Sequence, residues 1–197
     1  MKYPRNSHVL EFAILLAWVL PMTASQADNF TTTTSQLYQV PLPTWNDAIW
    51  QPGPVSPSAS NTYEVLDGGT LRNPPDGGIQ TFPGDSLTLD AGSRLRATGW
   101  SGVILSFPGV GGNPGLILNG GKLQATYGQA FTISGQMSVV ADSTIDQGWW
   151  SRGFVITAQI TGAANLTLIN GSRSSPLDIQ STNNPYSGNW LVRRGYL

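Results

Sequence analysis

The fold is decided by the stretch Leu87-Thr88-Leu89-Asp90-Ala91-Gly92-Ser93-Arg94-Leu95, because Leu116-Ile117-Leu118-Asn119-Gly120-Gly121-Lys122-Leu123 repeats its pattern. Each stretch begins with two apolar residues that are separated by one residue. An Asn or Asp follows directly, then a Gly, and the stretch closes with another apolar residue. Looser copies run over 65–71 and 190–197. The closing apolar residues fall about 22 to 29 residues apart, at Leu71, Leu95, Leu123, Ile145, Leu168 and Leu197. This spacing is typical of one coil of a solenoid.

Short strands separated by turns account for the rest of the repeating region. Apolar and polar residues alternate over 86–89, 131–133 and 165–168, and Gly-rich turn signals lie between such runs. Asn-Gly and Asp-Gly pairs also fit antiparallel hairpins of a sandwich. The roughly constant longer period favours an all-β, parallel β-helix, in which Leu89, Leu118 and Leu168 point inward. Turn-forming roles are predicted for Asp67, Asp90 and Asn119.

Bulk composition limits the partners of the chain. Its 197 residues suit one domain, and 11% of them are charged, with a formal net charge of -1. Such a chain has no basic field that would attract a phosphate backbone. We therefore expect no nucleic-acid partner.

Residues 1–27 have the pattern of a cleaved secretory signal peptide. Lys2 and Arg5 precede an apolar run over 12–20, and a small-residue site, Ser25-Gln26-Ala27, follows. The apolar run is much shorter than the ~20 residues that a membrane-spanning helix requires. The sequence therefore predicts a secreted or cell-surface protein without a membrane span after cleavage.

Three further regions follow the predicted signal peptide. Residues 28–42 are rich in Thr and Ser and are expected to form a leader or linker. Residues 43–62 are rich in Trp and Pro, and we expect Trp45 and Trp50 to cover the open end of the solenoid. Residues 63–197 contain the β-helix repeats.

The inventory of reactive side chains favours a protein that is not an enzyme. His8 lies in the predicted signal peptide and the chain has no Cys, so His- and Cys-based nucleophilic catalysis and the usual zinc sites are excluded after cleavage. We predict no catalytic residue, metal or cofactor. Carboxylate chemistry is the alternative: a polysaccharide-active β-helix glycosidase or lyase would use Asp pairs such as Asp67 and Asp90. The ionisable candidates are Asp67, Asp76, Asp85, Asp90, Asp142, Asp146, Asp178, Arg72, Arg94, Arg96 and Lys122.

Three tryptophans are the candidate ligand-binding residues. Trp149 and Trp150 are adjacent, and adjacent strand residues point to opposite faces, so one of the two is expected to be exposed. Trp100 is the third candidate. An exposed indole stacks on sugars or on a partner protein, whereas a loop that folds over the core would bury it. Both interpretations remain open.

The C-terminal region resembles the autotransporter-associated β-strand repeat. The resemblance rests on residues 160–171, with Asn165-Leu166-Thr167-Leu168, and on 183–197, with an Asn-x-Tyr-x-Gly turn and a closing Gly195-Tyr196-Leu197. It implies a right-handed parallel β-helix in an exported bacterial protein, with a scaffold role and no active site. The sequence departs from the repeat at Ala163-Ala164 and at Arg193-Arg194.

These features together predict an exported structural or adhesive scaffold of about five coils. The last copy of the pattern, 190–197, leaves the final coil without a polar cap. The chain is then either a piece of a longer repeat protein or is covered at this edge by another subunit. An extracellular glycan is the other expected partner.

Overall fold

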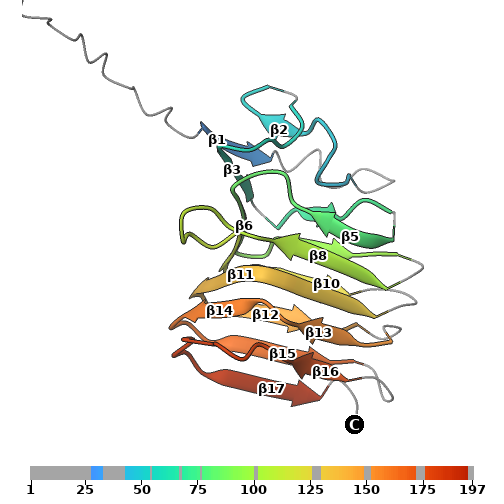
Figure 1. The fold of residues 1–197 in the computed structure, drawn as a ribbon, viewed down its shortest axis with the longest axis vertical. Coiled ribbons are helices and arrows are strands. Elements are labelled where there is room, and N and C mark those ends of the chain that lie inside the picture. The colour runs from blue at the N-terminus through green and yellow to red at the C-terminus, as the bar shows by residue number, and fades with distance from the viewer. Residues whose placement is uncertain are drawn as a thin grey trace, which may run out of the picture.

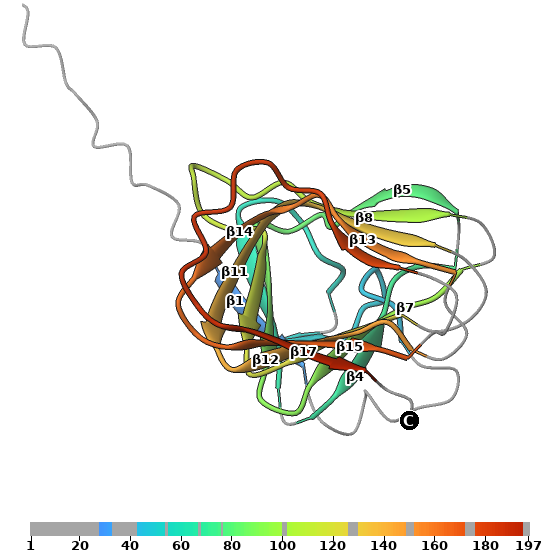
Figure 2. The same ribbon diagram turned by 90° about the horizontal axis from the view of Figure 1, so that it is seen from below.

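The computed structural model describes residues 28–32, 43–53, 55–66, 68–75, 77–99, 102–125, 130–148, 152–171 and 176–194. These residues form a β-solenoid of about five coils stacked along one axis (Figure 1). Viewed along that axis, three parallel sheets surround the core (Figure 2). The described ranges contain no helix, and therefore none long and apolar enough to cross a membrane.

The three sheets are named A, B and C in the order in which each coil passes through them. Sheet A contains β1 (Asp28–Thr32), β3 (Asn61–Val65), β6 (Ser86–Asp90), β9 (Leu116–Asn119), the second half of β11 (Phe131–Ala141) and β14 (Gln159–Gly162). Sheet B contains β4 (Thr70–Arg72), β7 (Arg94–Ala97), β10 (Lys122–Ala125), β12 (Ser143–Asp146), β15 (Leu166–Asn170) and β17 (Trp190–Arg194). Sheet C contains β5 (Gly78–Thr81), β8 (Val103–Phe107), the first half of β11, β13 (Phe154–Ile156) and β16 (Leu177–Ile179). One short strand, β2 (Trp50–Gln51), pairs antiparallel with β1.

The predicted repeat is the central row of sheet B. Five of its closing apolar residues are registered neighbours on successive strands, and all are buried: Leu71, Leu95, Leu123, Ile145 and Leu168. The sixth position differs from the prediction. Val192 of β17 is registered with Leu168, because β17 begins at Trp190. The predicted sixth member, Leu197, lies outside the described residues.

Alternating burial produces one continuous apolar core. The inward assignments of Leu89, Leu118 and Leu168 are confirmed, with exposed fractions of 0%, 0% and 6%. Residues between such positions face outward, as the alternating burial of β8 shows. Each coil thus buries its apolar row against the next, which is how a solenoid obtains its stability.

One corner of the solenoid is made without a loop. β11 runs unbroken from sheet C into sheet A and bends at Gly135, whose φ is +97°. A Cβ atom at this position would lie 2.0 Å from the carbonyl oxygen of Phe107. Glycine is therefore required both by the backbone angle and by the close approach of the neighbouring coil.

The N-terminal end begins earlier than the sequence indicated. The first five residues of the expected leader, 28–32, form β1, which pairs in parallel with β3, and β3 itself begins at Asn61 rather than at residue 63. Phe30 explains the difference: it is partly buried and stacks on Tyr63 with ring centroids 5.2 Å apart, so this stretch has an apolar anchor that its Thr-rich composition conceals. Residues 33–42 lie outside the described residues.

Candidate functional site

The three predicted ligand-binding tryptophans, Trp100, Trp149 and Trp150, lie outside the described residues. Their proposed stacking on glycans stays a prediction. The described part of the chain offers three other surfaces of interest: a groove on sheet A, the corner between sheets A and B, and the last strand of sheet B.

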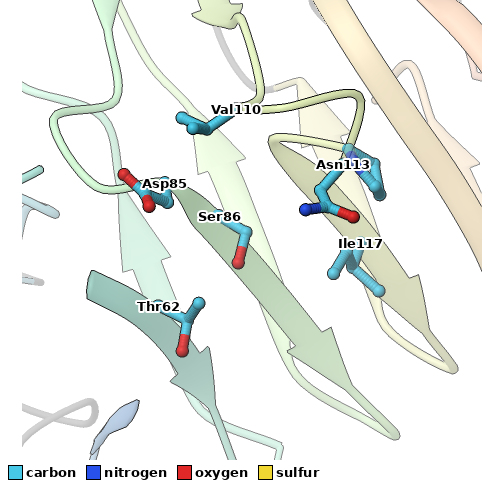
Figure 3. Close-up of a pocket in the computed structure, with 7 residues that line it drawn as sticks. Thr62, Asp85, Ser86, Val110, Asn113 and Ile117 are labelled. Atoms are coloured by element: carbon cyan, nitrogen blue, oxygen red, sulfur yellow. The ribbon is translucent and has the colours of Figure 1, made fainter. Parts of the chain in front are cut away.

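A groove crosses the outer face of sheet A below the loop that joins β8 to β9 (Figure 3). Thr62 of β3 and Ser86 of β6 are registered neighbours at its floor. The cavity has a volume of about 340 Å³. Its lining consists of Thr62, Asp85, Ser86, Val110, Asn113, Pro114 and Ile117.

The loop over this groove is an ordered turn. Val110 and Asn113 form an antiparallel bridge, and the Asn113 N–H donates to the Val110 carbonyl oxygen at 3.0 Å. Gly111 and Gly112 between them have positive φ angles of 59° and 83°. Residues 109–112 thus form a turn that holds Val110 and Asn113 at the rim of the groove.

The chemistry of the groove suits hydrogen bonding to a polar ligand. Asp85 contributes the one carboxylate of the lining, and one of its oxygens accepts from the Ser60 N–H at 2.8 Å. The hydroxyls of Thr62 and Ser86 and the side-chain amide of Asn113 also line the groove. Val110 and Ile117 add apolar surface beside them. The described residues of the lining include no second carboxylate.

The corner between sheets A and B holds a ladder of Asp and Asn side chains. The Asn119 amide donates to the Asp90 carboxylate at 2.8 Å, one coil apart. Further along the axis, the Asn165 side chain donates to Asp142 at 2.9 Å, and the Asn189 amide donates to Asn165 at 2.9 Å. The predicted turn roles of Asp90 and Asn119 are confirmed, because each ends a strand at this corner. Asp67 lies outside the described residues.

Two carboxylates near this corner have pKa values shifted in opposite directions. Burial raises the pKa of Glu64, and a hydrogen bond and the charge of Asp90 raise it further. Hydrogen bonds from the side chain and backbone of Asn165 lower the pKa of Asp142. The influence of Asp90 on the pKa of Glu64 indicates that the two carboxyl groups lie close together. The sequence analysis missed Glu64, since only the three-dimensional pairing brings it to Asp90.

The remaining candidate carboxylates lie on separate faces. Asp146 forms an ion pair with Lys122 on sheet B, with the charged atoms 3.6 Å apart. Asp178 on sheet C accepts a hydrogen bond from the Gln180 side-chain amide at 2.7 Å. Asp76 lies outside the described residues. Within the described ranges, no three His, Cys, Asp or Glu residues are close enough to hold a metal ion.

The last strand of sheet B exposes apolar side chains. Val192 is 76% exposed, Leu191 40% and Trp190 37%. The Trp190 ring contacts Tyr186 edge to face, with centroids 4.8 Å apart. Among the described residues, β17 pairs with β15 alone. Its other edge has no backbone partner in the described ranges and lies beside an apolar row.

Comparison of the chain with models of protein families, with curated proteins and with solved structures finds no match. The resemblance to the autotransporter-associated repeat therefore rests on the residues quoted above, and the β-solenoid rests on the strand pairing.

Proposed function

We propose that this chain is an exported structural or adhesive scaffold of the bacterial cell surface that associates with a second copy of itself through β17. The observation that carries the proposal is the position of Val192. This residue continues the buried row of sheet B, yet it is 76% exposed. Covering such a residue releases it from water, and pairing the strand edge satisfies its backbone groups.

The geometry of the two ends favours a closed dimer over a filament. At the N-terminal edge of sheet B, the Arg72 N–H donates to Pro43 and the Trp45 N–H donates to Arg72, both at 2.9 Å. This edge is already paired, so head-to-tail stacking through sheet B has no free strand to receive β17. Two copies of β17 can instead pair antiparallel across a two-fold axis, which gives an isologous interface.

Export is supported by the N-terminal sequence and by the first strand. Cleavage after Ala27 would leave β1 intact, because this strand begins at Asp28. The resemblance to the autotransporter-associated repeat supports the same location. A scaffold role, rather than an enzymatic one, is supported by Asp85, Asp146 and Asp178, which lie at three different sheets.

Cysteine cross-linking tests the dimer, since the chain has no Cys of its own. Val192 is the central residue of β17, so antiparallel pairing about a two-fold axis places the two Val192 positions opposite each other. Val192→Cys should form disulfide-linked dimers under mild oxidation. The matched control is Val140→Cys, at a 56% exposed position of β11, which should stay monomeric. Equal cross-linking of the two variants would contradict the proposal.

Export has a separate test. The full chain, expressed in a bacterium, should be recovered outside the cytoplasm with Asp28 as its first residue by N-terminal sequencing. Recovery of chains that all begin at Met1 would contradict export and would leave the dimer untouched.

A further inference from the structure

The groove on the outer face of sheet A is formed by a loop that folds back over the strands. The loop leaves β8 after Phe107 and returns to the sheet just before β9, and its two ends pass close to each other. A Cβ atom at Gly115 would lie 2.7 Å from the Phe107 carbonyl oxygen, so a side chain there would collide with the backbone. The bridge between Val110 and Asn113 closes the loop at its tip. The rim of the groove is therefore held in place by the fold.

Ser86 lies at the floor of the groove, under this loop. Leu87 points into the core, so Ser86 points outward. It is nevertheless only 8% exposed, and it lines the cavity. Within the described ranges, its hydroxyl takes part in no hydrogen bond. A covered hydroxyl of this kind gains a partner when a polar ligand enters the groove.

Three polar side chains converge on the groove. Asp85 lies on one side of Ser86, and the Asn113 amide extends toward Ser86 from the other (Figure 3). The Ser60 N–H donates to the Asp85 carboxylate at 2.8 Å, and the Asp85 N–H donates to the Asn61 carbonyl oxygen at 2.8 Å, so this residue is fixed at both groups. An ionised carboxylate only accepts hydrogen bonds, whereas a hydroxyl and an amide also donate them. A ligand that pairs with all three must both donate and accept.

Apolar side chains complete the lining. Val110 and Pro114 of the loop and Ile117 of β9 lie beside the polar groups. Because β3, β6 and β9 are successive neighbours, the floor between Thr62 and Ile117 extends over roughly 10 Å. The volume of about 340 Å³ falls at the lower end of the ~300 to 1,000 Å³ typical of small-molecule sites. A small ring with apolar faces and polar substituents matches such a lining.

We propose that this groove binds one uncharged sugar residue of an extracellular glycan. The sugar hydroxyls pair with Asp85, Ser86 and Asn113, since a hydroxyl can both donate and accept. The C–H groups of the sugar ring pack on the apolar side chains of the lining. This inference rests on the proposed adhesive function, to which it gives a ligand class and a site on sheet A.

Other ligand classes fit the groove less well. An acidic sugar or a phosphate would face the Asp85 carboxylate, and the described residues of the lining include no Lys, Arg or His to offset the repulsion. An extended peptide binds a sheet by pairing with a free strand edge, and β3, β6 and β9 are each paired on both sides. An ammonium group only donates, so it would pair with Asp85 but make no use of the donor groups of Asn113.

Glycan binding by the full chain tests this assignment. The probes are uncharged oligosaccharides of glucose, galactose, mannose and N-acetylglucosamine, with oligogalacturonate as the acidic comparison and a chitosan oligosaccharide as the cationic one. At least one uncharged probe should bind, and its affinity should change less than about twofold between low and high salt, because no ion pair forms. Absence of binding to every uncharged probe, or tighter binding of the acidic or the cationic probe, would overturn the proposal.

Two matched asparagine variants locate the site, with affinities for the bound probe measured in solution. Asn113→Ala removes the side-chain amide at the exposed rim of the groove and should weaken binding about tenfold. Asn183→Ala removes the same group at an exposed position between β16 and β17 and should change the affinity less than about twofold. Equal losses in both variants, or a loss in Trp149→Ala that Asn113→Ala does not show, would overturn the proposal. Val192→Lys, which disrupts the proposed dimer, should retain the binding, so failure of the dimer and failure of this site are distinguished.

Discussion

The two ends of sheet B are built differently. At the first strand, β4, the backbone is paired by residues 43–45, and Trp45 is buried behind it with 1% exposure. At the last described strand, β17, the outer edge has no partner among the described residues, and Val192 is 76% exposed. A repeat gains its stability from neighbours on both sides, so an end needs either a dedicated cap or another molecule. Residues 43–45 cap the sheet at β4, and we propose that a second copy of the chain covers it at β17.

Aromatic side chains explain how the N-terminal end is closed. Trp45 packs edge to face against Phe82 and Phe107, with centroids 5.9 and 5.8 Å apart, and Trp50 packs against Tyr63 at 5.0 Å. The Trp50 indole N–H donates to the Trp45 carbonyl oxygen at 3.1 Å. We name these five residues the aromatic plug. The plug replaces the apolar row that a preceding coil would supply.

The largest expected effect comes from opening the closed end. Trp45→Ala should lower the free energy of unfolding by about 3 to 5 kcal/mol, because it removes a large buried ring from the aromatic plug. Trp190→Ala on β17 should lower the free energy of unfolding by only about 1 kcal/mol, mainly because it removes the ring contact with Tyr186. Urea unfolding at low protein concentration measures both. Equal losses would mean that the two ends are equally closed.

A middle coil should behave like the closed end. Leu118→Ala should lower the free energy of unfolding by about 2 to 5 kcal/mol, since Leu118 is fully buried between coils. Its control is Val192→Ala, which should change monomer stability by less than about 0.5 kcal/mol. A negligible loss for Leu118→Ala in the same unfolding assay would contradict the inward assignment of the repeat.

The smallest effects concern the two carboxylates of the A–B corner. The folded pKa of Glu64 is raised, so its contribution to stability is present at low pH and is lost as pH rises through that pKa. Glu64→Gln should therefore stabilise the protein near pH 7 by less than about 1 kcal/mol and have little effect near pH 3.

Asp142 should show the opposite pH dependence. Because its folded pKa is lowered, its contribution is present above the unfolded pKa and is lost as pH falls through the folded pKa. Asp142→Asn should thus be the less stable protein near pH 7 and should approach the wild type in strong acid. Unfolding curves over a pH series measure the free energy of unfolding of both variants. If Glu64→Gln and Asp142→Asn changed this free energy in the same direction at pH 7, the two carboxylates would not have the different environments described here.

The sequence revealed the solenoid through the period of its apolar residues, because one position per coil must be buried in sheet B. It did not reveal β1, where a single apolar anchor, Phe30, is surrounded by threonines. It also placed the last repeat at Leu197, because Gly195-Tyr196-Leu197 matches the local pattern, whereas strand pairing selects Val192. The sheet A groove was not predictable, since its residues come from three coils and one loop.

The most direct test of the difference between the two ends is the solution mass of the chain, measured by light scattering over a range of protein concentrations. We predict a monomer at high dilution and a dimer at high concentration, with no larger species, because the outer edge of β17 has no partner among the described residues, whereas β4 is paired by residues 43–45. Val192→Lys should stay monomeric throughout, whereas Val140→Lys should follow the wild type. A wild-type chain that remains monomeric at every concentration, or one that grows without limit, would contradict this account.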